Sequence, residues 1–302
     1  MAGLPLNINP EEPPHKLYEG IEYKNFWNGL QKKKQDELEQ ALVRDLLPPK
    51  GRRIIDVGCG YGRLFDCYAQ RFKQVVMVDG SISLLRQAME RTAGKAIYIA
   101  SDVSHLPFRA GSFDSVLLIR VFHHIENSQA SLNELHRLLC RDGVFIFSYC
   151  NKRNAKRVFG WLLGKYSENP FSPDPAGIGS TFISHHPAAV ERMLIESGFS
   201  DLQSYGVGVF EKIAGKLGST GRWIPSGKRF SKFLGKSNLA PWIICRSITK
   251  HNSKLVEPRG FDDLLQCPVC SGELRGAYQK YHCLDCRRVY PVDNGIIDMR
   301  AL

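Results

Sequence analysis

The sequence predicts an α/β protein with a doubly wound, mostly parallel sheet of seven strands and a small, β-rich C-terminal unit. Three observations support this prediction. Short apolar runs rich in β-branched residues alternate with amphipathic helical patterns from about residue 50 onward. A turn with three glycines follows the first of these runs, and two pairs of closely spaced cysteines lie near the C-terminus. The length of 302 residues exceeds that of a typical single domain, which agrees with two units.

The first predicted strand, residues 54–57, leads into the run Asp56-Val57-Gly58-Cys59-Gly60-Tyr61-Gly62. Glycine lets the backbone turn tightly and approach a ligand without a Cβ in the way. In a doubly wound sheet such a ligand lies at the carboxyl ends of the strands. A dinucleotide fingerprint would need a small residue at position 63, where the chain has Arg63. The turn therefore indicates a ligand site, but not that of a typical dinucleotide.

Acidic residues follow the next two predicted strands. Residues 74–78 form the second strand and lead to Asp79-Gly80, and residues 96–100 form the third and lead to Ser101-Asp102-Val103. Asp79 lies 23 residues after Asp56, close to where a doubly wound fold places a carboxylate that accepts hydrogen bonds from ribose hydroxyls. The sequence therefore predicts a ligand that contains a nucleoside.

The order of these motifs resembles that of class I S-adenosylmethionine-dependent methyltransferases over about residues 40–210. The glycine turn, the two acids, Leu106-Pro107-Phe108 and the pair Phe113-Asp114 before a fourth strand at residues 115–119 all match. The resemblance implies that Asp102 accepts a hydrogen bond from the adenine amino group and that the amide of Val103 contacts the ring. It implies these cofactor-binding residues: Asp56, Gly58, Cys59, Gly60, Gly62, Asp79, Gly80, Asp102, Val103 and Arg120.

Arg120 and His124 follow the fourth strand, at the end where the methyl group is expected. They are candidates for contacts with the acceptor substrate. The alternative is that His123 or His124 caps the following helix, expected at residues 130–139, or bonds to the backbone. The sequence indicates no general base.

The remaining patterns complete the predicted sheet. We expect a fifth strand at residues 144–149, a helix from Pro187 to Gly198, a sixth strand at residues 201–210 and a seventh, antiparallel edge strand at residues 240–249. Two long connections interrupt this order. Residues 151–186 are interpreted as an irregular cover on the substrate side, because loops of this length are usually functional. Residues 211–239 form a basic insertion, expected to be helical around residues 229–234.

The N-terminal region precedes the glycine turn. Residues 1–17 are rich in proline and expected to be disordered, and an amphipathic helix is expected to end before Pro48-Pro49. Tyr23, Phe26 and Trp27 lie upstream of this helix. They either cover a sheet edge or form a lid over the cofactor. The methyltransferase domain would span residues 18–250.

Four cysteines near the C-terminus, Cys267, Cys270, Cys283 and Cys286, form the pattern C-x₂-C-x₁₂-C-x₂-C. Two such pairs supply four thiolates for tetrahedral Zn²⁺ and leave no open position, so we expect a structural zinc. A unit of about 40 residues needs this stabilisation to fold. Residues 262–302, after a linker at 251–261, resemble the small zinc-ribbon activator subunit of tRNA methyltransferases. The other cysteines are expected to be reduced core residues.

The resemblance implies transfer of a methyl group from S-adenosylmethionine to an oxygen, nitrogen or carbon of a small metabolite or lipid-like acceptor. A tRNA or rRNA methyltransferase is the alternative, because the net charge is +11 and most of the excess lies in residues 211–260. A non-catalytic protein that binds the cofactor is a third hypothesis. The chain has no apolar run of the roughly 20 residues that span a bilayer, and a cytoplasmic protein is expected.

Overall fold

The computed structural model describes residues 27, 29–177, 182–209, 228–250, 254–277 and 279–300. The predictions for residues 1–17, for Tyr23 and Phe26 and for most of the basic insertion lie outside these ranges. Within them, no helix combines the length and the apolar character needed to cross a bilayer.

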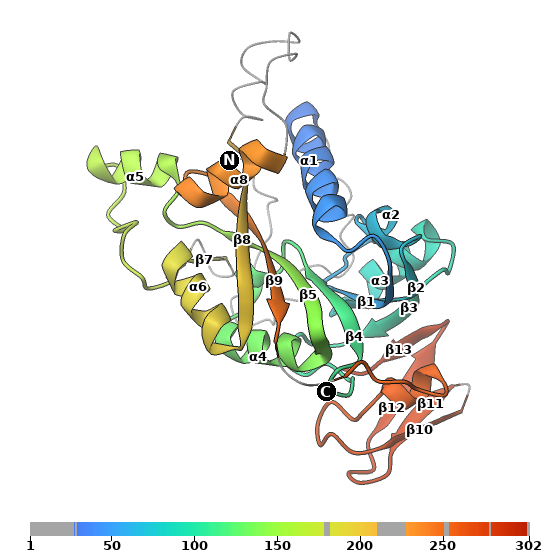
Figure 1. Ribbon diagram of the computed structural model, residues 1–302. Coiled ribbons are helices and arrows are strands. Elements are labelled where there is room, and N and C mark those ends of the chain that lie inside the picture. Colours follow the sequence, from blue (N-terminus) through green and yellow to red (C-terminus); the bar gives the residue numbers. More distant parts are fainter. Residues whose placement is uncertain are drawn as a thin grey trace.

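Seven strands form the α/β part of the sheet. They are β1 (Gly51–Val57), β2 (Phe72–Asp79), β3 (Ile97–Ala100), β4 (Phe113–Leu118), β5 (Leu139–Cys150), β8 (Phe199–Val207) and β9 (Trp242–Thr249). Their spatial order is β3-β2-β1-β4-β5-β9-β8 (Figure 1). Neighbouring strands are parallel except where β9 pairs with β5 and β8. The predicted doubly wound, mostly parallel sheet is confirmed.

The position of β9 corrects the expectation of an antiparallel edge strand. β9 lies between β5 and β8, so that β8 is the edge. The side chains of β9 are buried or half-buried along its whole length, whereas the middle of β8 is more accessible. A strand that is covered on both faces belongs in the interior of a sheet, and local sequence patterns do not reveal which neighbour it selects.

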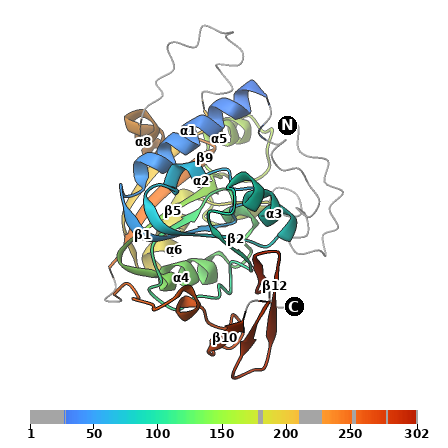
Figure 2. The same ribbon diagram turned by 90° about the vertical axis from the view of Figure 1, so that its right-hand side faces the viewer.

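Helices cover both faces of the sheet (Figures 1 and 2). They are α1 (Leu30–Leu46), α2 (Phe65–Tyr68), α3 (Ile82–Arg91), α4 (Ser128–Leu138), α6 (Pro187–Glu196) and α8 (Lys228–Ser237), whereas α5 (Ala155–Leu162) projects away from the sheet (Figure 1). Successive residues of β1 point to opposite faces: Ile54 packs with residues of α1, α2 and α3, and Ile55 packs with residues of α4 and α6. This two-sided burial explains why the predicted strands are continuous apolar runs.

The connection between β5 and α6, expected to be irregular, contains regular structure. The side chain of Asn154 caps α5 by accepting a 3.2 Å hydrogen bond from the amide of Arg157. Further on, β6 (Ala176–Gly177) pairs with β7 (Ile183–Ser184). Phe159 and Leu162 of α5 are exposed, which removes the usual contrast between a buried and a polar face that identifies a helix in sequence.

The C-terminal unit extends the main sheet. It contains a short 3₁₀ helix, η4 (Phe261–Leu264), and the strands β10 (Leu274–Ala277), β11 (Lys280–Cys283), β12 (Val289–Asp293) and β13 (Ile296–Asp298). These four strands pair in antiparallel order, and β13 then pairs in parallel with β3. Phe261 packs edge-on against Phe108, with ring centroids 6.3 Å apart. The unit thus occupies the sheet edge that β3 would otherwise leave open.

Candidate functional site

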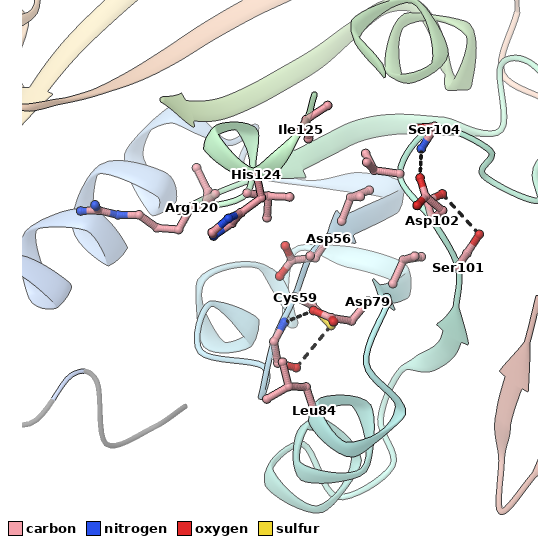
Figure 3. Close-up of a pocket in the computed structure, with 18 of the residues that line it drawn as sticks. Asp56, Cys59, Asp79, Leu84, Ser101, Asp102, Ser104, Arg120, His124 and Ile125 are labelled. Carbon is pink, nitrogen blue, oxygen red and sulfur yellow. Dashed lines mark hydrogen bonds between the residues drawn. The ribbon is translucent and has the colours of Figure 1, made fainter. Parts of the chain in front are cut away.

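A cavity of about 620 Å³ lies at the carboxyl ends of β1, β2, β3 and β4. Doubly wound sheets bind their ligands at this end of the strands, and the volume of the cavity suits a small organic ligand. Nine of the ten predicted cofactor-binding residues line it: Asp56, Gly58, Cys59, Gly60, Asp79, Gly80, Asp102, Val103 and Arg120. His124, the other predicted substrate-side residue, lines it as well. Figure 3 shows the three aspartates at the ends of neighbouring strands.

The turn after β1 requires glycine for steric reasons. Gly58 has φ +70°, and a Cβ at this position would lie 2.1 Å from Cγ2 of Val121. Gly62 also has a positive φ, +80°, but it is not among the residues that line the cavity. A Cβ on Gly62 would face Met77, Ala88 and Thr92. The structure therefore gives Gly62 a packing role against α3 in place of the predicted approach to a ligand.

The carboxylate of Asp79 is held by two backbone amides. Gly60 donates a 2.8 Å hydrogen bond to Oδ2, and Ser81 donates a 2.9 Å hydrogen bond to Oδ1. On the next strand end, Oδ1 of Asp102 accepts a 2.7 Å hydrogen bond from the amide of Ser104, and the Asp102 side chain is exposed. Both acids are thus oriented by backbone groups at the cavity.

Asp56 differs from the other two aspartates because it is buried. Its Oδ2 accepts a 2.7 Å hydrogen bond from the hydroxyl of Tyr68. Burial raises the pKa of Asp56 to about 7, against the opposing effects of the Tyr68 hydrogen bond and of the nearby Arg63 charge. The Asp56 carboxyl therefore changes its charge near neutral pH.

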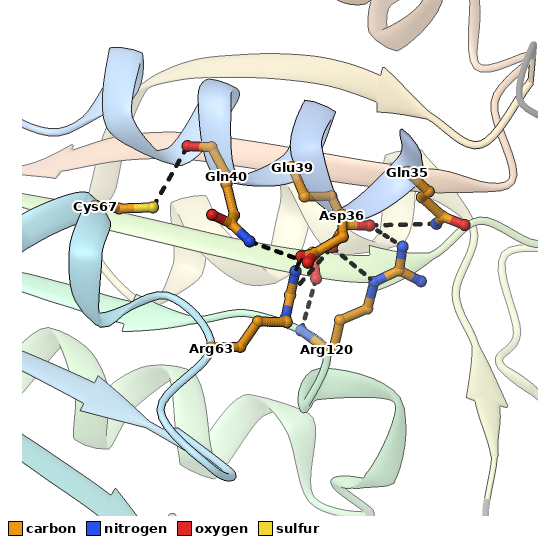
Figure 4. Close-up of polar contacts among 8 residues, drawn as sticks. Gln35, Asp36, Glu39, Gln40, Arg63, Cys67 and Arg120 are labelled. Carbon is orange, nitrogen blue, oxygen red and sulfur yellow. Dashed lines mark hydrogen bonds and ion pairs between the residues drawn. The ribbon is translucent and has the colours of Figure 1, made fainter. Parts of the chain in front are cut away.

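A buried ionic cluster lies beside the cavity and was not predicted (Figure 4). Glu39 of α1, only 1% exposed, accepts a 3.2 Å hydrogen bond from Arg63 and a shorter one from Arg120. Burial alone would raise the pKa of Glu39, but the two guanidinium groups outweigh it and hold this pKa below its usual value. The sequence does not predict the role of Glu39 because its partners are distant along the chain. Arg120, for example, is 81 positions away.

Two tryptophans cover the arginines of this cluster. The guanidinium carbon of Arg63 lies 4.2 Å from the ring centroid of Trp27, and that of Arg120 lies 3.6 Å from the ring centroid of Trp242. Such stacking is favourable for a planar cation. Arg120 has φ +64°, an unusual conformation for a residue other than glycine, and its amide donates a 2.8 Å hydrogen bond to Oγ of Ser148. α1 and Trp27 are thereby connected to the strand ends that form the cavity.

The two histidines after β4 lie in a short 3₁₀ helix, η3 (Phe122–His124). Neither caps α4: the cap is Asn127, whose side chain accepts a 3.1 Å hydrogen bond from the amide of Ala130. The capping alternative is therefore wrong. His123 is buried against Phe182 and Trp242, and its burial lowers its pKa well below the usual value. His124 is the one of the pair that reaches the cavity.

The sequence of this region agrees with the geometry of the site. Residues 55–147 match the family model of the methyltransferase domain. This part of the chain is a methyltransferase domain. The match runs from β1 to β5 and includes the glycine turn, Asp79 and Asp102. The family that the motifs resemble is thus confirmed.

Two curated relatives of the methyltransferase domain illustrate the range of the family. The demethylmenaquinone methyltransferase of Thermobifida fusca is 26% identical over 146 residues, which are 43% of this chain and 62% of that protein. A tRNA (carboxymethyluridine(34)-5-O)-methyltransferase of Xenopus tropicalis is 38% identical over 148 residues, which are 47% of this chain and 22% of that protein. The chain therefore spans less than two thirds of either relative.

A solved structure shares the fold of the methyltransferase domain. The magnesium protoporphyrin IX methyltransferase of Synechocystis, with bound S-adenosylhomocysteine, superposes with a TM-score of 0.54 at 16% identity. The superposition covers 78% of this chain and 98% of the Synechocystis chain. It supports the assignment of the fold.

The four clustered cysteines meet in the C-terminal unit. Their sulfur atoms all lie within 4.8 Å of one another, with Cys267 and Cys286 3.7 Å apart and Cys270 and Cys283 3.4 Å apart. Four thiolates at about 2.3 Å from a tetrahedral zinc are separated by about 3.8 Å, so this donor set fits zinc. The hydroxyl of Tyr290 lies 3.0 Å from the sulfur of Cys267 and can donate to a thiolate.

Several residues that line the cavity were not predicted from the sequence. They include Tyr61, Arg63, Leu84, Ser101, Ser104, His105, Ile125, Glu126, Asn127 and Arg300. Most of them neighbour a predicted residue in sequence and could have been found by extending each motif. Arg300 comes from the C-terminal unit, and nothing in the local sequence places it at this site.

Proposed function

We propose that this protein is an enzyme that transfers a methyl group from S-adenosylmethionine to a small, lipid-like acceptor. The observation that carries the proposal is the joint position of Asp79 and Asp102 beside the Gly60 turn, in the cavity of a methyltransferase domain. When bound, S-adenosylmethionine supplies a methyl group activated by a sulfonium for in-line attack by the acceptor. Asp79 would accept hydrogen bonds from the ribose hydroxyls, and Asp102 one from the adenine amino group.

The other residues would act by positioning and by exclusion of water. The buried cluster of Glu39, Arg63 and Arg120 holds α1 and Trp27 against the two arginines that line the cavity. Holding two reactants in line and away from water supplies much of the rate enhancement in a direct transfer. In the C-terminal unit, Zn²⁺ would be held by Cys267, Cys270, Cys283 and Cys286 and stabilise the fold.

A lipid-like acceptor is favoured by the surface formed by α5 and α8. The first residue of α5 is tied to the segment after α8, where the amide of Ala155 donates a 3.1 Å hydrogen bond to the carbonyl of Leu239. Four apolar side chains are 62–68% exposed here: Phe159 and Leu162 of α5, Leu163 directly after α5, and Phe233 of α8. Neither helix contains an acidic residue, and α8 carries Lys228, Arg229, Lys232 and Lys236. We call this set of residues the α5–α8 surface.

The α5–α8 surface has the chemistry of a membrane-binding face. Exposed aliphatic and aromatic side chains insert at a lipid interface, and the surrounding basic residues attract anionic headgroups. A phosphate-binding RNA surface needs the basic residues but gains little from exposed leucines. α5 follows β5, and α8 precedes β9, whose Trp242 stacks on Arg120 of the cavity. The α5–α8 surface is therefore connected to the end of the sheet at which the cavity lies.

The proposal is tested by supplying tritiated S-adenosylmethionine and the enzyme to separate lipid, RNA and water-soluble fractions of a cell extract. We expect label in the lipid fraction. Label in RNA would overturn the proposed acceptor and leave a methyltransferase of another class. Absence of both labelling and S-adenosylhomocysteine binding would overturn the proposed activity.

A further inference from the structure

The register of the sheet brings the C-terminal unit to the cavity of the methyltransferase domain. Asp298, at the end of β13, pairs with Ala100, at the end of β3, and the amide of Met299 donates a 2.8 Å hydrogen bond to the carbonyl of Ala100. Because the two strands are parallel, the segments that follow them leave the sheet at the same end. Ser101 and Asp102 follow one strand, and Arg300 follows the other. All three residues line the cavity.

Arg300 is held in a defined position. Its Nε donates a 2.9 Å hydrogen bond to Oδ1 of Asp298, and its Nη2 donates a 2.7 Å hydrogen bond to Oδ2 of the same carboxylate. Its Nη1 donates a 3.3 Å hydrogen bond to the carbonyl of Gly80, which follows Asp79 in sequence. The side chains of Arg300 and Asp298 are 21% and 14% exposed. A two-pronged bond to a largely buried carboxylate fixes the plane of the guanidinium group.

We propose that Arg300 is a cofactor-binding residue that the C-terminal unit contributes to the methyltransferase domain. This inference rests on the proposed function. Arg300 reaches the cavity between the loop of Gly80 and the loop of Asp102, the part of the cavity assigned to the nucleoside. Its planar cation is suited to pack against the adenine ring, since guanidinium groups stack on aromatic faces. Arg300 of the C-terminal unit would then add a third contact to the nucleoside, beside the ribose contact of Asp79 and the adenine contact of Asp102.

Zinc binding and cofactor binding are coupled by this arrangement. The cysteines order the C-terminal strands, and β13 carries Arg300 to the cavity through its pairing with β3. Loss of zinc would release the strand that positions Arg300 and weaken cofactor binding. By linkage, a bound cofactor would stabilise the docked C-terminal unit to the same extent.

The proposal is tested by measuring the dissociation constant of S-adenosylhomocysteine by titration calorimetry for zinc-loaded wild type, Arg300→Ala, Arg300→Lys and Arg86→Ala. Arg86 is a matched control because it pairs with Asp293 of the C-terminal unit, 2.8 Å away, but does not line the cavity. We expect Arg300→Ala to weaken binding about tenfold and Arg300→Lys to restore it only in part. Arg86→Ala should bind like the wild type.

Two further measurements separate the proposal from a general effect on folding. 5′-Methylthioadenosine, which lacks the amino-acid part, should lose affinity for Arg300→Ala by the same factor. A zinc chelator should weaken S-adenosylhomocysteine binding in the wild type and add little further loss in Arg300→Ala. Unchanged binding by Arg300→Ala, or equal weakening in Arg86→Ala and Arg300→Ala, would overturn the proposal. Failure of the wild type to bind S-adenosylhomocysteine would overturn the proposed function itself.

Discussion

The amide of Gly60 donates a 2.8 Å hydrogen bond to the carboxylate of Asp79, which ties the turn after β1 to the carboxyl end of β2. This bond sets the orientation of the acid before any ligand arrives. Since Ser81 donates to the other oxygen, both carboxylate oxygens are fixed by the backbone. The Asp79 carboxylate is thus preorganised at the carboxyl end of β2.

Asp79→Asn should weaken the binding of S-adenosylhomocysteine by about 10- to 100-fold, because hydrogen bonds to a charged acceptor contribute about 1.5–3 kcal/mol. The side-chain NH₂ group of the asparagine would also face the backbone amide of Gly60 or Ser81, and two donors do not form a hydrogen bond. Titration calorimetry measures the effect, and the exposed Asp66→Asn serves as control. Equal affinities of Asp79→Asn and the wild type would contradict the assigned role of Asp79.

Asp56→Asn should change the pH dependence of stability. Burial raises the pKa of Asp56 from 3.8 to about 7, so the folded protein binds more protons than the unfolded chain between these values. The stabilisation by the Asp56 carboxyl is complete below the unfolded-state pKa of 3.8. It falls as the pH rises, by up to about 1.4 kcal/mol per pH unit, until the pH passes the folded-state pKa of about 7. Asparagine does not ionise, so the variant should lack this loss.

Urea denaturation at about pH 5, 6 and 7 measures the free energy of unfolding of both proteins. We expect Asp56→Asn to gain stability relative to the wild type as the pH rises across this range. A constant difference between the two proteins at all three pH values would show that Asp56 titrates normally in the folded state.

Glu39→Gln should destabilise the protein by about 3 kcal/mol, because it removes the buried counter-ion of Arg120 and leaves Arg63 with the less buried Asp36. The control is Glu37→Gln on the exposed face of the same helix, which should change little. Urea denaturation of the three proteins compares them directly. Similar losses in the two variants would contradict the structural importance of the buried cluster.

Purified protein should contain one zinc ion per chain by elemental analysis. Cys283→Ser should lose the metal, since the three remaining thiolates no longer fill a tetrahedral site. Cys150→Ser is the control: its cysteine lies outside the cluster, and burial raises its pKa to about 11. A metal content that does not respond to Cys283→Ser would rule out the four-cysteine site.

Phe159→Glu and Phe233→Glu, on the α5–α8 surface, should each reduce co-sedimentation with anionic phosphatidylglycerol vesicles several-fold. Ile195→Glu on α6 changes a residue that is 59% exposed outside this surface and should leave sedimentation unchanged. Binding should also fall with added salt, because the lysines and arginines of α8 attract the headgroups. Wild-type protein that does not sediment with these vesicles would argue against a membrane-bound acceptor.

The parts of the site that the sequence predicts are those built from local motifs. Gly58, Gly60, Asp79 and Asp102 each stand at the end of a strand, and the topology of a doubly wound sheet brings these ends together. Gly62 belongs to the same motif but packs against α3, because a pattern of glycines does not distinguish approach to a ligand from approach to a helix.

The parts that could not be predicted depend on pairing between distant segments. The hydrogen bond from Arg300 to the Gly80 carbonyl spans 220 positions, and it exists only because β13 adds to the edge at β3. Likewise, the interior place of β9 follows from its pairing with both β5 and β8. Local periodicity identifies such strands but does not determine their neighbours.

A crystal structure of the protein with S-adenosylhomocysteine decides whether the strand ends around Asp79 and Asp102 bind the cofactor. We expect the ribose hydroxyls within hydrogen-bonding distance of the Asp79 carboxylate and the adenine beside Asp102. Density for the ligand at another site, or an empty cavity at saturating ligand concentration, would show that these strand ends do not form a cofactor site.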